Sequence, residues 1–230
     1  MRCRYIRRVT TARFWHLLTA AVAVGALLLQ LILVLQGGRV LDEQEIPGLG
    51  IRVGRLASYF TIQSNLLVAI TAALLAVSPQ YDARWWRVAR LDAVVGIALT
   101  GVVHFFLLLP LLDLSGADYV ADKLLHMVVP ALAVIGWLAF GPRPRVSASV
   151  VRWALLWPVV WLLWTLSMGL ATGWFPYPFL DHREDGWAAV IIVSVVITAL
   201  FVGLSVAARW WDERFSPSRA AGASPPLPRG

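Results

Sequence analysis

Six long apolar runs constrain this chain more than any other feature of its sequence. They lie near residues 14–36, 58–78, 91–112, 123–141, 150–170 and 187–208, and each contains almost no charge. A helix rises about 1.5 Å per residue, so about 20 apolar residues cross a hydrocarbon core of roughly 30 Å. Transmembrane strands would instead alternate apolar and polar side chains over short segments. The sequence therefore predicts an all-α, polytopic membrane bundle of six transmembrane helices.

The distribution of charge predicts the orientation of these spans. Fifteen of the 20 basic residues, but only four of the 13 acidic residues, fall in the N-terminal segment, the second and fourth connections and the C-terminal segment. This side has a formal charge of +11 and the other side −4, which together give the net charge of +7. Basic residues that flank spans remain cytoplasmic. We expect both termini in the cytoplasm and the protein in the cell membrane.

The sequence also predicts where the transmembrane domain ends and which segments lie outside the spans. We expect a six-span transmembrane domain, residues 1–211, and a disordered cytoplasmic tail, residues 212–230, that is rich in Pro, Ser and Ala. The glycine-containing connection 37–57 is predicted to be a loop.

Many arginines and a single lysine are typical of a GC-rich bacterial genome, which favours a bacterial inner membrane. Topology and anionic headgroups account for the basic charge, so the expected partner is the lipid bilayer and not nucleic acid. No sequence feature specifies an oligomeric state.

Polar side chains inside the spans gather near the predicted outer surface. Thr61, Ser64 and Asn65 share one face of the second span, because residues three and four apart are neighbours on a helix. His126, in the fourth span, follows Asp122 by one turn. Thr61 and His126 each lie three residues past the predicted start of a span, which is about 5 Å below the outer interface. Polar groups are costly in lipid and usually face a bundle interior. We therefore expect these two side chains to meet.

The surroundings of His126 suit a general base. Asp122 can orient its imidazole or stabilise an imidazolium, and Pro130 has no N–H to donate to the His126 carbonyl, so the helix should kink there. A base of this kind could activate the Thr61 hydroxyl as a nucleophile. His104, in the third span, is a second and deeper intramembrane histidine. The alternative interpretation is that all these groups only form hydrogen bonds between helices.

Other classes of site have less support. A metal centre made from His104, His126, His182 and a carboxylate lacks a ligand spacing such as H-x-x-x-H, and the single cysteine excludes a cysteine cluster. We expect no metal and no other cofactor.

A tryptophan stripe marks the fifth span. Trp153, Trp157, Trp161 and Trp164 fall on one helical face. The pattern is typical of a lipid-facing or packing surface, and a substrate-binding wall is the alternative.

Three segments together resemble a known family. They are Phe60-Thr61 with Asn65 and Leu66, His126 with Pro130, and residues 173–182, which read GWFPYPFLDH. In this order they are similar to segments of the androgen-induced-gene family of six-span membrane proteins. The animal members of that family hydrolyse fatty acid esters of hydroxy fatty acids. The resemblance implies that Thr61 is the nucleophile and His126 the catalytic histidine.

These observations lead to one expected function and one alternative. The expectation is a lipid ester hydrolase, in which Asn65 or a freed backbone donor stabilises the oxyanion. The supporting or substrate-binding residues are Ser64, Asn65, His104, Asp122, Tyr177, Asp181 and His182, of which the last three belong to a predicted lid. The alternative is a non-enzymatic membrane protein, either a small-molecule carrier or a scaffold for a partner. No charged pathway crosses the midplane in the sequence, which weakens the carrier alternative.

Overall fold

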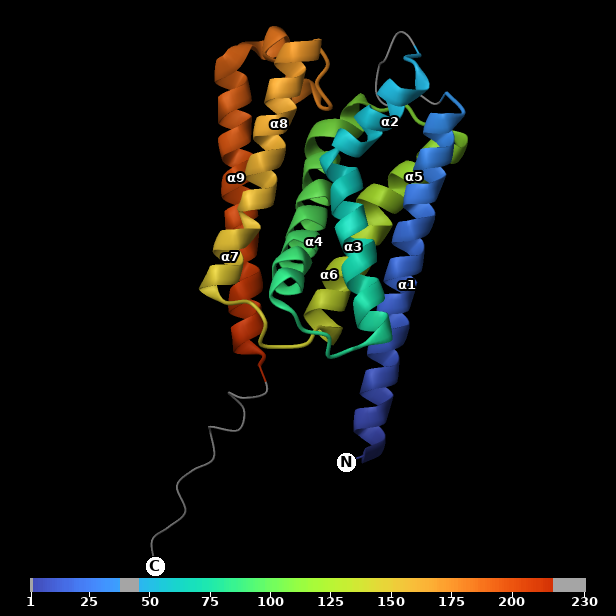
Figure 1. Ribbon diagram of the computed structural model, residues 1–230, viewed down its shortest axis with the longest axis vertical. Helices are drawn as coiled ribbons and strands as arrows, with labels where there is room; N and C mark the ends of the chain where they lie inside the picture. Colours follow the sequence, from blue (N-terminus) through green and yellow to red (C-terminus); the bar gives the residue numbers. More distant parts are fainter. Residues whose placement is uncertain (1, 38–45, 217–230) are drawn as a thin grey trace, which may run out of the picture.

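The computed structural model describes residues 2–37 and 46–216 of the chain, with side chains described from Val9 onwards. In these ranges the regular structure is entirely helical. Six helical segments are long and apolar enough to cross a membrane, and Figure 1 shows them standing side by side as a bundle. They are Val9–Leu35, Phe60–Val77, Arg84–Leu111, Gly116–Phe140, Ala148–Thr172 and His182–Arg214. The predicted fold class, an all-α bundle of six transmembrane helices, is confirmed.

One half of the bundle is packed on small side chains. It consists of α1 (Arg2–Leu35), α3 (Phe60–Val77), α4 (Arg84–Val103), α5 (Gly116–Lys123) and α6 (Val129–Phe140). Ala23, Ala69 and Ala93 lie in its buried core, together with Val68, Ile97 and Val129. Because small side chains let helix backbones approach closely, this half is compact.

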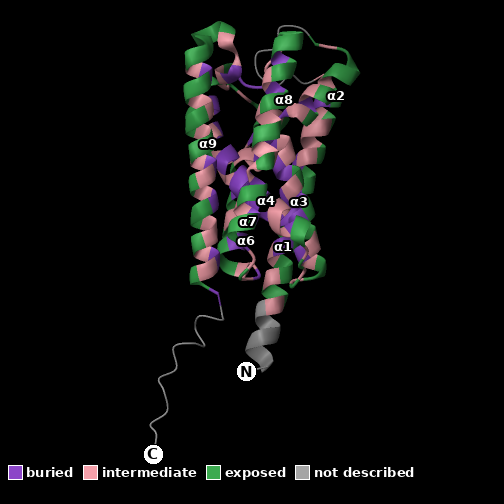
Figure 2. Ribbon diagram, turned by 60° about the vertical axis from the view of Figure 1, so that its left-hand side comes forward, coloured by how far each residue is buried: buried purple, intermediate pink, exposed green. Residues whose placement is uncertain are grey.

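The other half is packed on aromatic side chains. It consists of α7 (Ala148–Ala154), α8 (Leu156–Thr172) and α9 (His182–Arg214), beside α4 in Figure 1. Phe60, Tyr177 and Phe201 belong to the core cluster that joins this half to α3 and α4. The outer faces are different: in Figure 2 exposed residues follow the outside of the helices, and large apolar side chains such as Leu28 and Ile192 are about half exposed or more. Such a surface is typical of contact with lipid.

Spans three and four both contain an irregular turn. After α4 the chain continues through a π-helical turn, His104–Leu108, and a 3₁₀ turn, Leu109–Leu111. Between α5 and α6 lies a second π-helical turn, Leu124–Val128, in which the Val129 N–H bonds the carbonyl five residues back. The irregularity predicted from Pro130 therefore takes the form of a widened turn. π-Helical turns inside α-helices are frequent at functional sites.

Two predicted boundaries differ from the structure. The connection 37–57 was predicted to be a loop, but Leu49–Ser58 forms helix α2, whose buried Leu56 packs inward. The predicted tail begins at residue 212, but α9 continues to Arg214, and the buried Asp212 carboxylate accepts hydrogen bonds from the backbone N–H groups of Arg145 and Val146. These bonds tie the end of α9 to the connection before α7. The predicted disorder concerns residues 217–230, which lie outside the described residues.

Candidate active site

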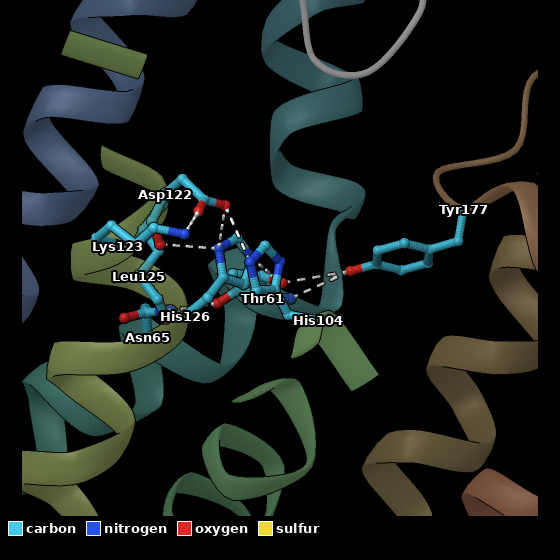
Figure 3. A network of polar contacts seen from close by, with 8 residues as sticks. All are labelled: Thr61, Asn65, His104, Asp122, Lys123, Leu125, His126 and Tyr177. Atoms are coloured by element: carbon cyan, nitrogen blue, oxygen red, sulfur yellow. Dashed lines mark hydrogen bonds and ion pairs between the residues drawn. The ribbon is translucent and has the colours of Figure 1, made fainter. Parts of the chain in front are cut away.

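Thr61, His126 and Asp122 form a line of polar contacts (Figure 3). Thr61 Oγ1 lies 3.3 Å from His126 Nε2, and His126 Nδ1 lies 3.0 Å from Asp122 Oδ1. The same Nδ1 lies 3.0 Å from the backbone carbonyl of Asp122. Both of these oxygens are acceptors, so the neutral ring has its hydrogen on Nδ1 and presents the lone pair of Nε2 to Thr61. Thr61 and His126 are thus in contact, as their similar depth predicted.

The helix geometry around His126 depends on a glycine of α4. His126 occupies the π-helical turn before Pro130, which cannot donate to the His126 carbonyl. That carbonyl points at Gly101, where an added Cβ would lie only 3.2 Å from its oxygen. Gly101 therefore allows α4 to approach the turn closely and holds the imidazole over Thr61.

His104 lies directly against His126. The two rings are stacked, with centroids 3.9 Å apart and planes at 10°, and His104 Nε2 lies 3.4 Å from Asp122 Oδ1. Lys123 Nζ contacts the other oxygen of the same carboxylate at 3.1 Å. Asp122 and His104 are almost fully buried, while the side chain of His126 is 15% exposed. Lys123 is not among the site residues predicted from the sequence. Its position next to Asp122, at the start of a span, could have indicated that it belongs to the site.

The three residues His104, Asp122 and His126 also have the composition of a metal site. One potential ligand atom from each lies within 4.8 Å of the others. The lone pairs of an imidazole lie in the plane of its ring, however, and these two planes are nearly parallel in a stack. Both rings cannot direct a lone pair at one ion without the rotation of at least one of them. The observed arrangement is that of a hydrogen-bonded network.

Tyr177 brings a hydroxyl to Thr61 from the connection between α8 and α9. Its Oη lies 3.5 Å from Thr61 Oγ1, and the Thr61 N–H donates to it over 3.4 Å. Thr61 is the second residue of α3, so its N–H has no acceptor within the helix. Burial raises the pKa of the Tyr177 phenol above its ordinary value of 10.0, which keeps the group protonated and able to donate. Tyr177 and the Thr61 N–H thus form a pair of donors beside Thr61 Oγ1.

Asn65 and Ser64 are both buried, but neither contacts the Thr61 hydroxyl. The Asn65 side-chain amide donates to the carbonyls of Thr61 and Leu125, which joins α3 to the π-helical turn. Ser64 Oγ faces α4 beside Gly96 and has no hydrogen-bond partner among the described residues. Asn65 therefore positions the turn of His126, and Ser64 lies outside the site.

Asp181 and His182 also lie apart from Thr61. Asp181 accepts a hydrogen bond from the Arg183 N–H at the start of α9, and the Arg183 guanidinium holds the pKa of this carboxyl below its usual range. The His182 ring stacks on Trp187, with centroids 4.5 Å apart. Of Tyr177, Asp181 and His182, only Tyr177 forms a hydrogen bond to Thr61.

Two cavities meet at Thr61. The polar cavity, about 100 Å³, is lined by His104, Asp122 and His126 together with residues of α1 and α2. The apolar cavity, about 150 Å³, lies between α4, α8 and α9 and is lined mainly by aliphatic and aromatic side chains such as Leu162 and Phe201. Thr61, Leu108 and Tyr177 line both cavities. The Thr61 hydroxyl thus stands between a cavity that contains the Asp122 and histidine side chains and a cavity that is lined mainly by apolar side chains.

Comparison with known proteins adds no further constraint. No protein-family model matches the chain, and no solved structure matches it.

Proposed function

We propose that the protein is a membrane-embedded hydrolase that cleaves lipid esters, with Thr61 as nucleophile and His126 as general base. The observation that carries the proposal is the alignment of Thr61, His126 and Asp122, in which the free lone pair of His126 faces the hydroxyl. A hydroxyl flanked by a base that a carboxylate orients is the arrangement of nucleophilic acyl transfer. The resemblance of the sequence to the androgen-induced-gene family supports the same reaction.

The first half of the reaction transfers the acyl group to the protein. Thr61 Oγ1 attacks the ester carbonyl carbon while His126 Nε2 takes the hydroxyl proton, and the carbonyl π electrons move to oxygen. The Tyr177 hydroxyl and the Thr61 N–H stabilise that oxyanion. When the intermediate collapses, the C–O bond to the alcohol breaks, and His126 returns its proton to the leaving oxygen. The products are an acyl ester of Thr61 and a free alcohol.

The second half releases the acid. A water molecule in the polar cavity gives a proton to His126 and attacks the acyl carbon, and the bond to Thr61 Oγ1 breaks with return of the proton to that oxygen. Asp122 is a positioning residue in both halves, because it fixes the ring without contact with the reacting atoms. His104, which stacks on His126 and has Nε2 3.4 Å from Asp122 Oδ1, limits the movement of both groups.

The two cavities suggest how the substrate lies. The apolar cavity accommodates a hydrocarbon chain, and the polar cavity accommodates the alcohol side and water. The proposed substrate is therefore an ester with an apolar acyl group, drawn from the surrounding bilayer. We place the protein in the cell membrane of a bacterium, with both termini in the cytoplasm and the site toward the outer leaflet.

A direct test uses purified protein in lipid nanodiscs and a fluorogenic fatty acyl ester. We expect Thr61→Ala and His126→Ala each to lower the rate by about 10³-fold or more, since a nucleophile and its base act as a unit. Thr71→Ala is the matched control, because Thr71 is a buried threonine of the same helix that bonds the Leu67 carbonyl and lies outside both cavities. A fluorophosphonate should label Thr61 and not Thr71.

The outcomes separate the proposal from the non-enzymatic alternative. Hydrolysis that is unchanged in both Thr61→Ala and His126→Ala would exclude the mechanism. A carrier would instead give substrate-dependent flux into liposomes without covalent labelling of Thr61.

A further inference from the structure

A long groove opens on the side of the bundle between α3, the first half of α4 and α7–α8. Its volume is about 1190 Å³. The tryptophan stripe of Trp153, Trp157, Trp161 and Trp164 lines one wall of it. Thr61 does not line this groove, and Trp161 is the one residue that the groove shares with the apolar cavity.

The opposite wall contains a buried carboxylate without a partner. Asp92 lies in α4, eight residues after Arg84, and only 4% of the residue is exposed. Its Oδ1 is buried and has no hydrogen-bond partner, and its carboxylate takes part in no ion pair among the described residues. An isolated charge inside a membrane protein is costly and normally faces a partner or a pathway. The partner of Asp92 is therefore to be sought in the groove.

The other groups around the groove do not neutralise Asp92. Arg87 lies at the end of the groove and forms two hydrogen bonds to Asp82, at 2.6 and 2.5 Å. Arg84 is exposed at the same end. The polar residues that α3 and α7 contribute to the wall, Gln63, Ser147 and Ser149, are uncharged, and no charged residue of α3, α7 or α8 lines this part of the described structure. The interior of the groove thus has a single acidic group.

The aromatic wall stands at the level of this carboxylate. An added Cβ at Gly96 would lie 2.8 Å from the Trp157 ring, so this indole packs directly on α4 one turn beyond Asp92. The α7–α8 segment runs in the same direction as α4 (Figure 1). Trp153 lies one turn before Trp157, and Asp92 lies one turn before Gly96, so Trp153 lies at the level of Asp92. The Trp153 side chain is 65% exposed. An indole face attracts a cation, and most strongly where water is excluded.

We infer that this groove binds a lipophilic organic cation, with Asp92 as its counter-ion and the tryptophan stripe as its aromatic wall. A small inorganic cation is a poor ligand here, since indole and aliphatic walls do not replace its hydration shell. The ammonium group of a bilayer phospholipid stays at headgroup level, whereas Asp92 lies about 12 Å along α4 from the first residue of that helix. A cation that carries its own apolar surface can reach the depth of Asp92 and can also contact the indole and aliphatic walls.

Tetraphenylphosphonium is a suitable probe, because tetraphenylborate has nearly the same shape and the opposite charge. Binding of each ion to the full-length protein in nanodiscs would be measured by isothermal titration calorimetry, with empty nanodiscs subtracted. We expect saturable binding of the phosphonium and no saturable binding of the borate. Asp92→Asn keeps the shape of the side chain and should weaken phosphonium binding about tenfold or more. Trp153→Leu should weaken it several-fold.

Thr61→Ala and the thermal unfolding midpoint serve as controls. Thr61→Ala should bind the phosphonium as the natural chain does, whatever its effect on hydrolysis. The variants at Asp92 and Trp153 should unfold at a temperature close to that of the natural chain. Equal binding of the two ions, or phosphonium binding that Asp92→Asn leaves unchanged, would overturn the inference and leave ordinary bilayer lipid as the occupant.

Discussion

A single carboxylate organises the candidate site. Asp122 contacts His126, His104 and Lys123, at 3.0, 3.4 and 3.1 Å. Lys123 places a positive charge beside this carboxylate. In the proposed reaction His126 accepts a proton from Thr61, and the same carboxylate stabilises the imidazolium.

The variant Asp122→Asn tests whether the Asp122 carboxylate supports His126 as a base. The backbone carbonyl that accepts from His126 Nδ1 remains in this variant, but the asparagine removes the negative charge that would stabilise the imidazolium formed when His126 takes the Thr61 proton. We expect kcat for ester hydrolysis to fall by roughly 10²- to 10⁴-fold with little change in KM. Steady-state rates on a fluorogenic acyl ester measure both constants. A kcat within twofold of the natural chain would mean that the Asp122 charge does not support the reaction.

Tyr177→Phe tests the proposed oxyanion donor. The change removes the hydroxyl near Thr61 but keeps the ring, which stacks on Phe179 with centroids 5.2 Å apart. We expect kcat to fall by roughly 10- to 10³-fold, since the Thr61 N–H remains as one donor. Tyr81→Phe, at the other end of α3, is the matched control and should leave the rate unchanged. Equal rates for the two variants would remove Tyr177 from the mechanism.

The sequence predicts some of these residues better than others. The contact between Thr61 and His126, and the position of Asp122 beside His126, follow from depth and from helical spacing, which are local properties. The hydrogen bonds of Asn65 could not be predicted, because its acceptor at Leu125 belongs to another helix. His104 and His126 are 22 residues apart in the sequence, and only the packing of two irregular turns stacks them.

At the scale of elements, both histidines lie in π-helical turns. A π-helical turn contains more residues than an α-helical turn and changes the direction in which the next side chains point. His104 begins one such turn and His126 stands in the middle of the other. The stack between them therefore requires that both turns keep this geometry.

Gly101→Ala tests the dependence of the site on helix packing. The new methyl group would meet the His126 carbonyl at 3.2 Å, so the turn that carries the imidazole must shift by a few tenths of an ångström. We expect hydrolysis to fall by about tenfold, because small displacements of a base are costly to catalysis. Gly203→Ala is the matched control, since nothing lies within 4 Å of the added atom, and it should keep the rate and gain up to about 1 kcal/mol in stability. Equal rates would show that the turn tolerates the contact.

Helix α2 shows why one element escaped prediction. Its segment contains Gly50 and Gly54, which disfavour a helix when it is considered alone. Leu49, Val53 and Leu56 nevertheless recur at helical spacing, and burial of Leu56 compensates for the glycines. The six spans could be predicted because each is a long apolar run that is recognisable in the sequence alone. Helix α2 is short, and its stability depends on packing against neighbouring helices.

At the scale of the whole molecule, an even number of spans returns the chain to the side where it begins. Figure 1 shows the start of α1 and the end of α9 at the same end of the bundle, together with the connections α3–α4 and α6–α7. The candidate site lies toward the opposite end. The charge asymmetry of the sequence predicts that the first end is cytoplasmic.

The single cysteine permits a direct test of this orientation. Cys3 lies in the basic N-terminal segment, so a membrane-impermeant maleimide should label it in bacterial cells only after the membrane is permeabilised. In the variant Cys3→Ser, Ser115→Cys, the thiol replaces an exposed residue before α5 at the other end, and intact cells should be labelled. Labelling is read by gel shift. The reverse pattern would invert the assignment and place the site toward the inner leaflet.

The separation of the two cavities at Thr61 has a kinetic consequence. An ester cleaved there leaves its acid in the apolar cavity and its alcohol in the polar cavity, so that neither product occupies the place of the other. The protein can then hold both products at once. Added fatty acid and added alcohol should therefore bind at the same time and inhibit hydrolysis as a ternary complex with the protein. Two products that shared one cavity would instead compete with each other for it.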